Sequence, residues 1–379
     1  MCSKALLDHF SVLSDPRQVW KAVYPLPEIL TVILCATLAG AEDFVEIERW
    51  AQQKLAFLRR LLPFEDGIAS HDTLNDVMNA LASDLFGECF TTWVESLRES
   101  EPDFVAIDGK TSRRSHDRSA DKAPLHLVSA FATTARLVLG QEAVADKSSE
   151  TTAIPILLER LARDGGLEGA LVSIDAIATN ATIATAIGNA DADYLLAVKA
   201  NQPTIRGEIE AYFAEAPASC LDTFEDLDKA HGRIEQRTVT VSRETDWLNG
   251  TCRFPGELRL PAAASIVRVA AKAELKDRYR IETRYYISSA TLSPRTTSRT
   301  RRAQSLGDRE LTTLDLDVTF KDDQSRLRKG HGANNMAIVR HIAINLVRAV
   351  TDKKSIKLRR KRAGWNTKYL QTLLGTLDR

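Results

Sequence analysis

Two short apolar segments that each end in an aspartate constrain the fold of this chain more than any other feature. Residues 104–107 lead into Asp108 and Gly109, and residues 171–174 lead into Asp175. Short runs of apolar β-forming residues closed by a turn signal are typical of buried strands. A carboxylate at the end of a buried strand is poorly solvated, so a cation is its natural partner. The pattern predicts a sheet in which two central strands each end in an acidic residue.

Each aspartate also has a plain structural explanation, because Asp and Gly are common turn residues. The repetition of the pattern favours a functional explanation. Two carboxylates at one edge of a sheet repel each other unless a divalent cation lies between them, and two such ions can clamp the attacking and leaving oxygens of a phosphoryl transfer. The cations that follow Asp108, which are Lys110, Arg113 and Arg114, suit a phosphate-bearing substrate.

The region around the two aspartates alternates between strand-like and helix-like patterns. VAIDGK, HLVSAFAT and RLVLGQEAV predict an antiparallel meander, and a helix follows over 149–163. A second helix over 182–189 separates the strand that ends at Asp175 from a further strand within DYLLAVKANQP. Strands that alternate with helices predict an α/β fold, with both aspartates at one edge of its sheet.

The residues before this region are predicted to form a separate helical domain over 1–100. Its apolar residues recur at three- to four-residue spacing, Gly40 indicates a break between two helices, and Ser70 is a typical helix cap.

The chain after this region divides into three parts. Residues 204–290 alternate apolar with polar residues, which predicts a β-rich insertion, and residues 334–350 predict a helix that packs on the sheet. Residues 351–379 predict a basic tail with Trp365. This tail either neutralises phosphates or is simply solvated.

Composition limits the compartment and the partners. Among 379 residues, 51 Lys and Arg balance 51 Asp and Glu, so any attraction to nucleic acid must come from local clusters. The five cysteines are widely separated, which suits thiols in a reducing cytoplasm better than a disulfide framework or a zinc site. The apolar run over 29–41 is too short to span a membrane, and no signal-peptide pattern is visible. The sequence predicts a cytoplasmic protein with no membrane partner.

Several segments taken together resemble one family of transposases. AIDGKTSRRS, SIDAIATN and YLLAVKANQP are similar to signature segments of the ISAs family of insertion-sequence transposases, also called H-repeat-associated proteins. The start of the chain, with SDPR and SHDTL, resembles that family's N-terminal associated domain, and residues 316–348 resemble its C-terminal end. Two departures are small: Asn180 stands where the family usually has Gln, and Ser149 where it often has Asn.

The resemblance implies a fold and a chemistry for residues 101–350. The fold is an RNase H-like mixed sheet flanked by helices and interrupted by the β-rich insertion. The chemistry is strand transfer by a DDE triad with two divalent ions, Mg²⁺ or Mn²⁺, and Asp108 and Asp175 fall on the first two acidic positions. The implied partner is double-stranded DNA, as the element's terminal inverted repeats and the target, bound by a homo-oligomer that associates with the nucleoid.

The resemblance also implies residues that contact DNA. Lys199, Asn201 and Gln202 fall on the family's KxNQ segment, and HGRIEQR, with His231 and Arg233, resembles a further family segment. Outward-facing charge on an exposed strand is the alternative explanation for the last two.

The family pattern breaks at its third acidic residue. The family carries HWxIENxLHW a few residues before LDVTF, whereas this chain has Arg309 at the expected spacing and Glu310 one residue away. Glu310 is therefore predicted as the third catalytic and metal-binding residue. One explanation of the break is a compensated frameshift from about Pro294 to Leu314, because codons compatible with SLGDRELTTL can spell IEN and LHW in another frame. The other is real divergence, with Glu310 on a rebuilt helix.

Three functions are open at this point. The first is an active DDE transposase, and the second is a catalytically inactive relic that still binds element ends, which the altered third motif favours. The third is a metal-dependent nuclease that cuts without joining. Binding without cleavage would mark the second, and cleavage without joining would mark the third.

Overall fold

In the computed structural model, the described residues are 4–98, 104–112, 114–116, 123–144, 150–163, 166–175, 179–230, 233–249, 253–254, 257–275, 278–295, 297–298, 315–350 and 352–375. The helices before the sheet are α1 (Lys4–Ser11), α2 (Leu26–Ala39), α3 (Phe44–Gln53), α4 (Leu55–Leu58), α5 (His71–Ala80) and α6 (Ser83–Glu95). The later helices are α7 (Glu150–Ala162), α8 (Ala181–Asn189), α9 (Pro203–Glu215), α12 (Gly332–Arg348), α13 (Ile356–Trp365) and α14 (Thr367–Gly375). The strands are β1 (Phe104–Thr111), β2 (His126–Ala132), β3 (Leu137–Val144), β4 (Leu171–Ile174), β5 (Asp193–Val198), β6 (Asp222–Ala230), β7 (Arg233–Ser242), β8 (Ser265–Leu275) and β9 (Arg278–Ser288).

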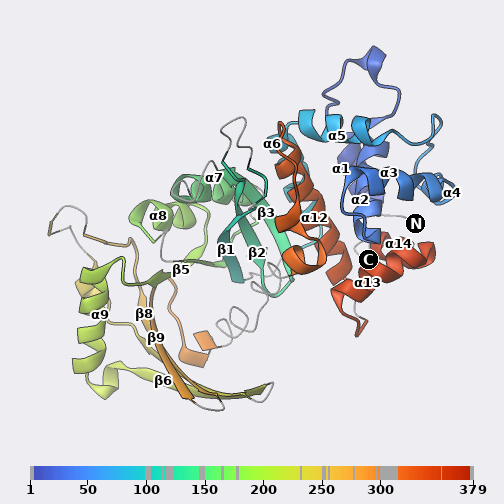
Figure 1. Ribbon diagram of the computed structural model, residues 1–379. Coiled ribbons are helices and arrows are strands. Elements are labelled where there is room, and N and C mark those ends of the chain that lie inside the picture. The colour runs from blue at the N-terminus through green and yellow to red at the C-terminus, as the bar shows by residue number, and fades with distance from the viewer. Residues whose placement is uncertain are drawn as a thin grey trace.

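The described strands form one mixed sheet in the order β3-β2-β1-β4-β5-β9-β8-β7-β6. The first three strands are an antiparallel meander, and β4 and β5 run parallel to β1. Figure 1 shows α7 and α8 beside this part of the sheet. An antiparallel meander followed by two parallel strands, in the order 3-2-1-4-5, is the RNase H-like arrangement. The structure therefore confirms the predicted α/β fold.

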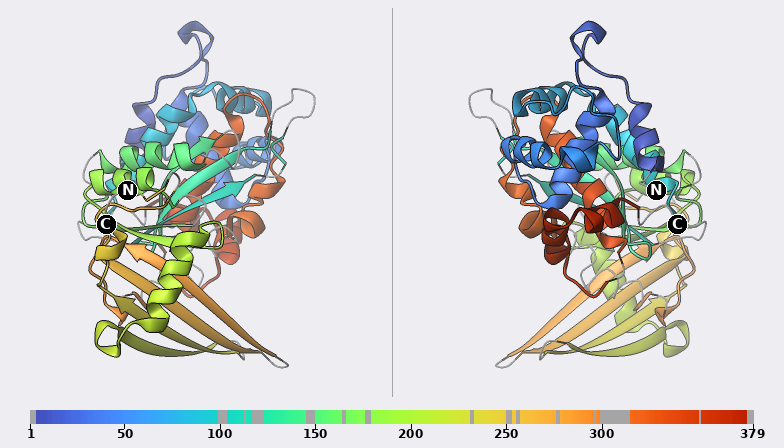
Figure 2. Two further views of the ribbon diagram at one scale, coloured as in Figure 1. Left: turned by 90° about the vertical axis from the view of Figure 1, so that its left-hand side faces the viewer. Right: turned by 90° about the vertical axis from the view of Figure 1, so that its right-hand side faces the viewer.

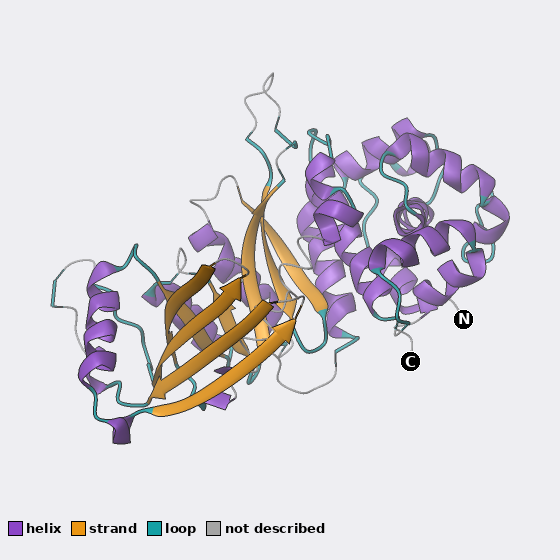
Figure 3. Ribbon diagram, turned by 60° about the horizontal axis from the view of Figure 1, so that its bottom comes forward, coloured by secondary structure: helices purple, strands orange, loops and turns teal. Residues whose placement is uncertain are grey.

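The predicted insertion continues this sheet instead of forming a separate one. Strand β9 pairs with β5 in antiparallel fashion, and β8, β7 and β6 follow in turn. Figures 2 and 3 show these long strands extending away from the helical part of the molecule. The strand-rich prediction is wrong at the start of the insertion, where α9 lies. Pro203 occupies the first helical turn, and Ile205, Ile209 and Phe213 bury one face at four-residue spacing.

The N-terminal helices confirm the predicted helical pattern, including the break at Gly40 and the helix cap at Ser70. Gly40 follows α2 with a φ of 105°, a left-handed conformation that glycine adopts without strain. The Ser70 side chain accepts a hydrogen bond from the Thr73 N–H and so caps α5. No helix in the described part of the chain is both long and apolar enough to cross a lipid bilayer.

The C-terminal helices join the sheet to the N-terminal helices. Helix α12 lies between the two in Figure 1 and is buried over most of its length. Asn335 in α12 donates to the carbonyl oxygens of Met78 and Leu81, and Asn345 exchanges two hydrogen bonds with Val138 in β3. The segment predicted as a basic tail instead folds as α13 and α14, and α13 packs against α2.

The two faces of the sheet have different coverings. Val105 and Ile107 belong to the large core that includes residues of α7 and α8. Phe104 and Ala106 point to the opposite face, where they form a second core with residues of β5, β7 and β8 and with Leu292. Because side chains alternate along a strand, Asp108 and Lys110 continue the face of Phe104 and Ala106.

Candidate active site

The register of β1 and β4 brings the two predicted carboxylates together. Ile107 pairs with Ile174 in parallel, and Asp108 and Asp175 are the next residues of the two strands. Neighbouring strands lie about 4.8 Å apart. The aspartates therefore lie side by side on adjacent parallel strands. Asp175 directly follows the end of β4, as predicted, but the prediction that the first strand ends at Asp108 is wrong, because β1 continues to Thr111 along β2.

Asp175 already has a cation beside it. The Lys199 ammonium, just beyond the end of β5, lies 2.5 Å from an Asp175 carboxylate oxygen. Both side chains are about half exposed, at 56% for Lys199 and 45% for Asp175. Ion pairs at this exposure contribute roughly 0–1 kcal/mol, so Lys199 can exchange the carboxylate for a phosphate at little cost.

A chain of hydrogen bonds fixes the loop that carries Lys199. The Gln202 amide nitrogen donates to the Thr179 carbonyl oxygen at 2.8 Å, and the Thr179 hydroxyl donates to the Ala197 carbonyl oxygen at 2.8 Å. Gln202 thus ties the loop after β5 to the loop after β4. Asn201, beside it, is exposed. The contacts of Gln202 support a positioning role, and its predicted contact with DNA stays a prediction.

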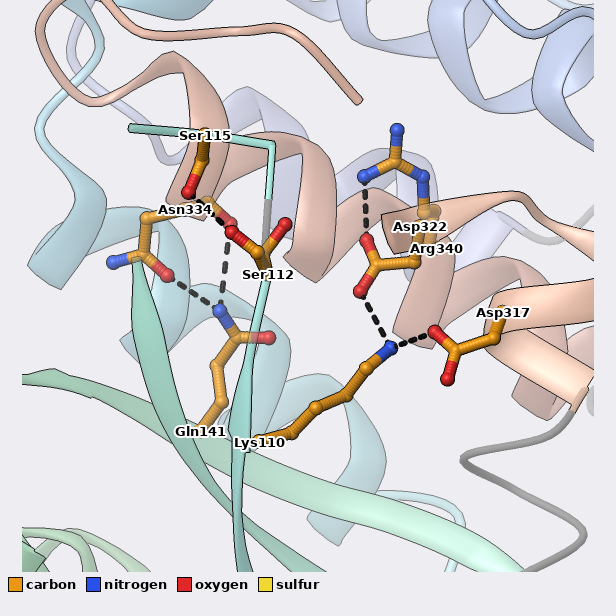
Figure 4. Close-up of polar contacts among 8 residues, drawn as sticks. All are labelled: Lys110, Ser112, Ser115, Gln141, Asp317, Asp322, Asn334 and Arg340. Atoms are coloured by element: carbon orange, nitrogen blue, oxygen red, sulfur yellow. Dashed lines mark hydrogen bonds and ion pairs between the residues drawn. The ribbon is translucent and has the colours of Figure 1, made fainter. Parts of the chain in front are cut away.

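Lys110 lies in an internal ion network (Figure 4). Its ammonium contacts a carboxylate oxygen of Asp317 and lies 2.9 Å from Asp322, whose other oxygen lies 2.8 Å from the Arg340 guanidinium. The Lys110 side chain is only 19% exposed. The structure therefore gives this predicted DNA contact two carboxylate partners inside the protein. These contacts hold β1 against α12 and the segment that precedes it.

Opposite charges decide the ionisation of this network. Burial raises the pKa of Asp322, but the charges of Arg340 and Lys110 outweigh that effect and hold the pKa below its usual value. Burial lowers the pKa of Lys110, and the charge and hydrogen bonds of Asp322 and Asp317 reverse that shift, so the pKa of Lys110 is raised. Lys110 and Asp322 are therefore both charged near neutral pH, which is the state in which such a buried cluster is paired.

The base of the loop after β1 is held in place by hydrogen bonds. The Ser115 hydroxyl donates to the Ser112 carbonyl oxygen at 2.7 Å and accepts from the Leu125 N–H at 2.6 Å. Between these two serines, Arg114 is exposed. The loop thus presents Arg114 to solvent from a fixed base.

Some predicted residues cannot be placed. Glu310, Arg113 and His231 lie outside the described residues, and of Arg233 only the backbone, at the start of β7, is described. Within the described ranges, no group of three or more His, Cys, Asp or Glu side chains converges as a metal site would. The described part of the chain therefore brings together two of the three predicted acidic residues.

These two carboxylates fit a hard divalent cation. Mg²⁺ and Mn²⁺ prefer oxygen donors, and Mg²⁺ is commonly held by one or two carboxylates together with water and substrate phosphate. Asp108, within β1, and Asp175, directly after β4, offer such donors on adjacent parallel strands, and Asp175 already forms an ion pair with Lys199.

Three residues of the Lys110 network escaped sequence reasoning, namely Asp317, Asp322 and Arg340. One signal for them exists: Arg340 and His341 interrupt the apolar run of residues 336–344 in α12. A charged residue in such a position is buried only with a partner, so this pattern predicts an acidic group nearby.

Comparison with known proteins identifies the family. Residues 99–346 match the model described as "Transposase DDE domain", and residues 7–94 match the model DDE_Tnp_1-associated. The chain is 35% identical to "H repeat-associated putative transposase YhhI" of Escherichia coli strain K12, over 98% of each chain. It is also 35% identical to "Putative transposase YncI" of Escherichia coli O157:H7, over 99% of this chain and 96% of that protein.

Among solved structures, a piggyBac transposase synaptic complex with hairpin DNA aligns with a TM-score of 0.42 and 10% identity, over 99% of this chain and 80% of that one. The two family models and the nearly full-length relatives together show that the chain belongs to the DDE transposases of insertion sequences, in the H repeat-associated group.

Proposed function

We propose that this transposase cuts and joins DNA strands at the ends of its insertion sequence, with Asp108 and Asp175 as ligands of divalent metal ions. The observation that carries the proposal is the parallel register of Ile107 and Ile174, which sets the two aspartates side by side. Asp108 and Asp175 would hold the ions, which would supply positive charge to the reacting phosphate and help activate the attacking water or 3′-hydroxyl.

The residues around the aspartates would bind and orient the DNA. Lys199 leaves Asp175 for a phosphate oxygen, and the hydrogen bonds of Gln202 hold its loop while it does so. Arg114, presented from its fixed loop, neutralises a further phosphate. Lys110 keeps the strand of Asp108 in place through Asp322. Holding reactants in line is the larger part of catalysis in such phosphoryl transfers.

Glu310 is proposed as the third acidic ligand. The described chain on both sides of 299–314 supports an acid from this segment. Leu292 packs against Phe104 and Ala106, and Asp317 contacts Lys110, so both flanks lie on the face of the sheet to which Asp108 points.

The test is cleavage and joining of a labelled duplex that carries one element end, with Mg²⁺ or Mn²⁺. Wild type should cut and join, and Asp108→Asn, Asp175→Asn and Glu310→Gln should each lower the rate by a hundredfold or more, roughly the effect of removing a catalytic charge. The control is Asp76→Asn, the same isosteric change on the exposed face of α5, which should be fully active.

Full activity of Asp108→Asn would show that Asp108 is not a catalytic ligand and would overturn the proposed site. Loss in the two aspartate variants with full activity in Glu310→Gln would instead leave the pair intact and reject Glu310 as the third ligand.

A second function, an inactive relic that binds element ends, is favoured by the altered third motif. Binding of the end duplex without cleavage under any metal condition would support it. Translation of the gene in the other two frames tests the origin of the altered motif, because the absence of an IEN-like string there would reject the frameshift.

A further inference from the structure

We propose that the exposed face of α13 is a second DNA-binding surface, which grips the phosphate backbone of double-stranded DNA outside the site of Asp108 and Asp175. This inference rests on the proposed function, since it extends the same DNA contact to another part of the molecule.

The buried face of α13 includes two of its arginines, which is unusual for a basic helix. Arg359 and Arg360 point inward and are 8% and 5% exposed, and Ala363 is buried beside them. At Gly364 the helix approaches α2 so closely that an added Cβ would lie 2.6 Å from the Ala39 carbonyl oxygen. Two of the arginines in the basic run are thus structural, and only the opposite face is free for a ligand.

That opposite face carries a stripe of cations and one aromatic ring. Lys357, Lys361 and Trp365 recur every four residues, and the two lysines are exposed while Trp365 is 73% exposed. Residues four apart lie on one side of a helix, and eight residues span about 12 Å. Phosphates follow one another about 3.4 Å apart along the axis of one strand, so the stripe covers roughly three of them.

No acidic group in the described part of the chain neutralises this stripe. Among the described residues, neither Lys357 nor Lys361 has a carboxylate within ion-pair distance, and the nearby Asp352 is engaged by Arg359 and Arg362. Lys353 and Lys354 precede the helix, and its first turn contains no acid. Cations at the positive end of a helix dipole are unfavourable, and a bound polyanion removes that repulsion.

Double-stranded DNA is the partner that this chemistry fits. The lysines form a row of strongly hydrated point charges suited to phosphates, and the Trp365 ring can lie against the sugars while its N–H donates to a phosphate. A surface of this kind holds DNA without reading its sequence.

The surface is also fixed relative to the strand that carries Asp108. Arg360 donates to the carbonyl oxygens of Thr37 and Thr319, and its guanidinium lies 4.1 Å from the centre of the Phe320 ring. Asp317, two residues before Thr319, contacts Lys110 in β1. One short segment therefore contacts both α13 and the catalytic strand, so DNA bound at one place has a defined position at the other.

The test is the affinity of the full chain for a labelled element-end duplex, measured by fluorescence anisotropy in EDTA over a salt series. The double variant Lys357→Gln/Lys361→Gln should bind about tenfold to a hundredfold more weakly near 0.1 M salt. The slope of log affinity against log salt should fall by about 2, since each lost phosphate contact removes about 0.9. Trp365→Ala should weaken binding with little change in that slope.

The matched control is Arg49→Glu, an exposed position on α3 that changes the net charge by the same two units. It should bind like wild type, and a circular-dichroism melt should show all variants folded. Wild-type affinity and slope in the double variant would overturn the inference, as would an equal loss in the control. Stronger competition by an RNA duplex than by a DNA duplex of equal length would reject DNA as the partner.

Failure of the inference can be distinguished from failure of the proposed function. If wild type never cuts but the lysine variant loses binding, the surface stands and the catalytic proposal falls. If wild type cuts and the lysine variant binds normally, the opposite holds.

Discussion

At the scale of the residue, burial and charge decide which polar groups bind ligand and which hold the fold. Lys110 and Arg114 lie on the same exit from β1, yet Lys110 is paired with Asp317 and Asp322 while Arg114 is exposed. His341 is a third case: it is 5% exposed, its Nδ1 has no hydrogen-bond partner among the described residues, and its ring lies 6.2 Å from that of Phe90.

His341 makes the stability of the protein sensitive to acid. Burial is the main cause that lowers its pKa to about 4. The charge of Asp322 opposes this shift, and the charges of Lys110, Arg340 and Arg348 add to it. The folded protein keeps His341 neutral below the pKa of about 6.5 that it has when unfolded, so stability is complete above that pH and is lost as the pH falls toward 4. Between pH 7 and pH 5 the loss should be about 2 kcal/mol.

Urea unfolding of wild type and of His341→Gln at the two pH values measures this loss. The variant should lose about 2 kcal/mol less than wild type on acidification. An equal loss in both proteins would show that other groups cause the acid sensitivity.

At the scale of the element, close approach of backbones decides how the C-terminal helices dock. The basic run over 351–379 looks like a solvated tail in sequence, but α13 uses Gly364 and Ala363 to lie against α2. Helix α9 was not predicted, because its run of apolar residues at four-residue spacing is short and is followed by long strands whose residues alternate between apolar and polar.

Replacement of Gly364 by alanine should therefore destabilise the protein. The added Cβ would lie 2.6 Å from the backbone oxygen of Ala39, which cannot move aside as a flexible side chain would, so we expect a loss of about 1–3 kcal/mol in urea unfolding. Gly207→Ala in α9 is the control, because nothing lies within 4 Å of its Cβ position. That change should be neutral or stabilising by up to about 1 kcal/mol. A neutral effect at Gly364 would mean that α13 is not docked as described.

At the scale of the whole molecule, the boundary near residue 100 in the sequence is not a boundary in space. Helix α12 contacts the sheet through Asn345 and the N-terminal helices through Asn335, and α13 packs on α2. The helical part is therefore built from both ends of the chain, and the sheet is joined to it through α12 and α6, which both contact β3.

A chain truncated to residues 99–379 should not fold stably. It would expose the apolar faces of α12 and α13, and each buried Leu or Ile left in water costs about 1.5–3 kcal/mol. Gel filtration and thermal melting should show aggregation or no cooperative transition, and co-expression of residues 1–98 as a separate chain should restore a soluble complex. A monomeric truncated protein with the melting temperature of the full chain would contradict this view.

Much of the fold could be predicted from local pattern. The meander, α7, α8 and the two strands that lead into the aspartates follow from apolar periodicity and turn residues, and Gly40 and Ser70 act as predicted, whereas the expected end of the first strand at Asp108 is wrong because β1 continues to Thr111. The pairing of the insertion with β5 could not be predicted, because alternation along a strand does not say which edge it joins. For the site, the sequence indicated Asp108 and Asp175, and it missed Asp322 because an ion pair between residues 212 positions apart leaves no local pattern.

The sequence by itself determined the family, the order of strands and helices from β1 to β5, and the two aspartates that β1 and β4 lead into, because each of these is encoded in short stretches of residues. Only the tertiary structure decided that the two aspartates lie side by side, that Lys110 and Arg360 hold the protein together, and that Lys357, Lys361 and Trp365 face solvent. Those properties depend on register and on which face of an element is buried, and both are set by contacts between distant parts of the chain.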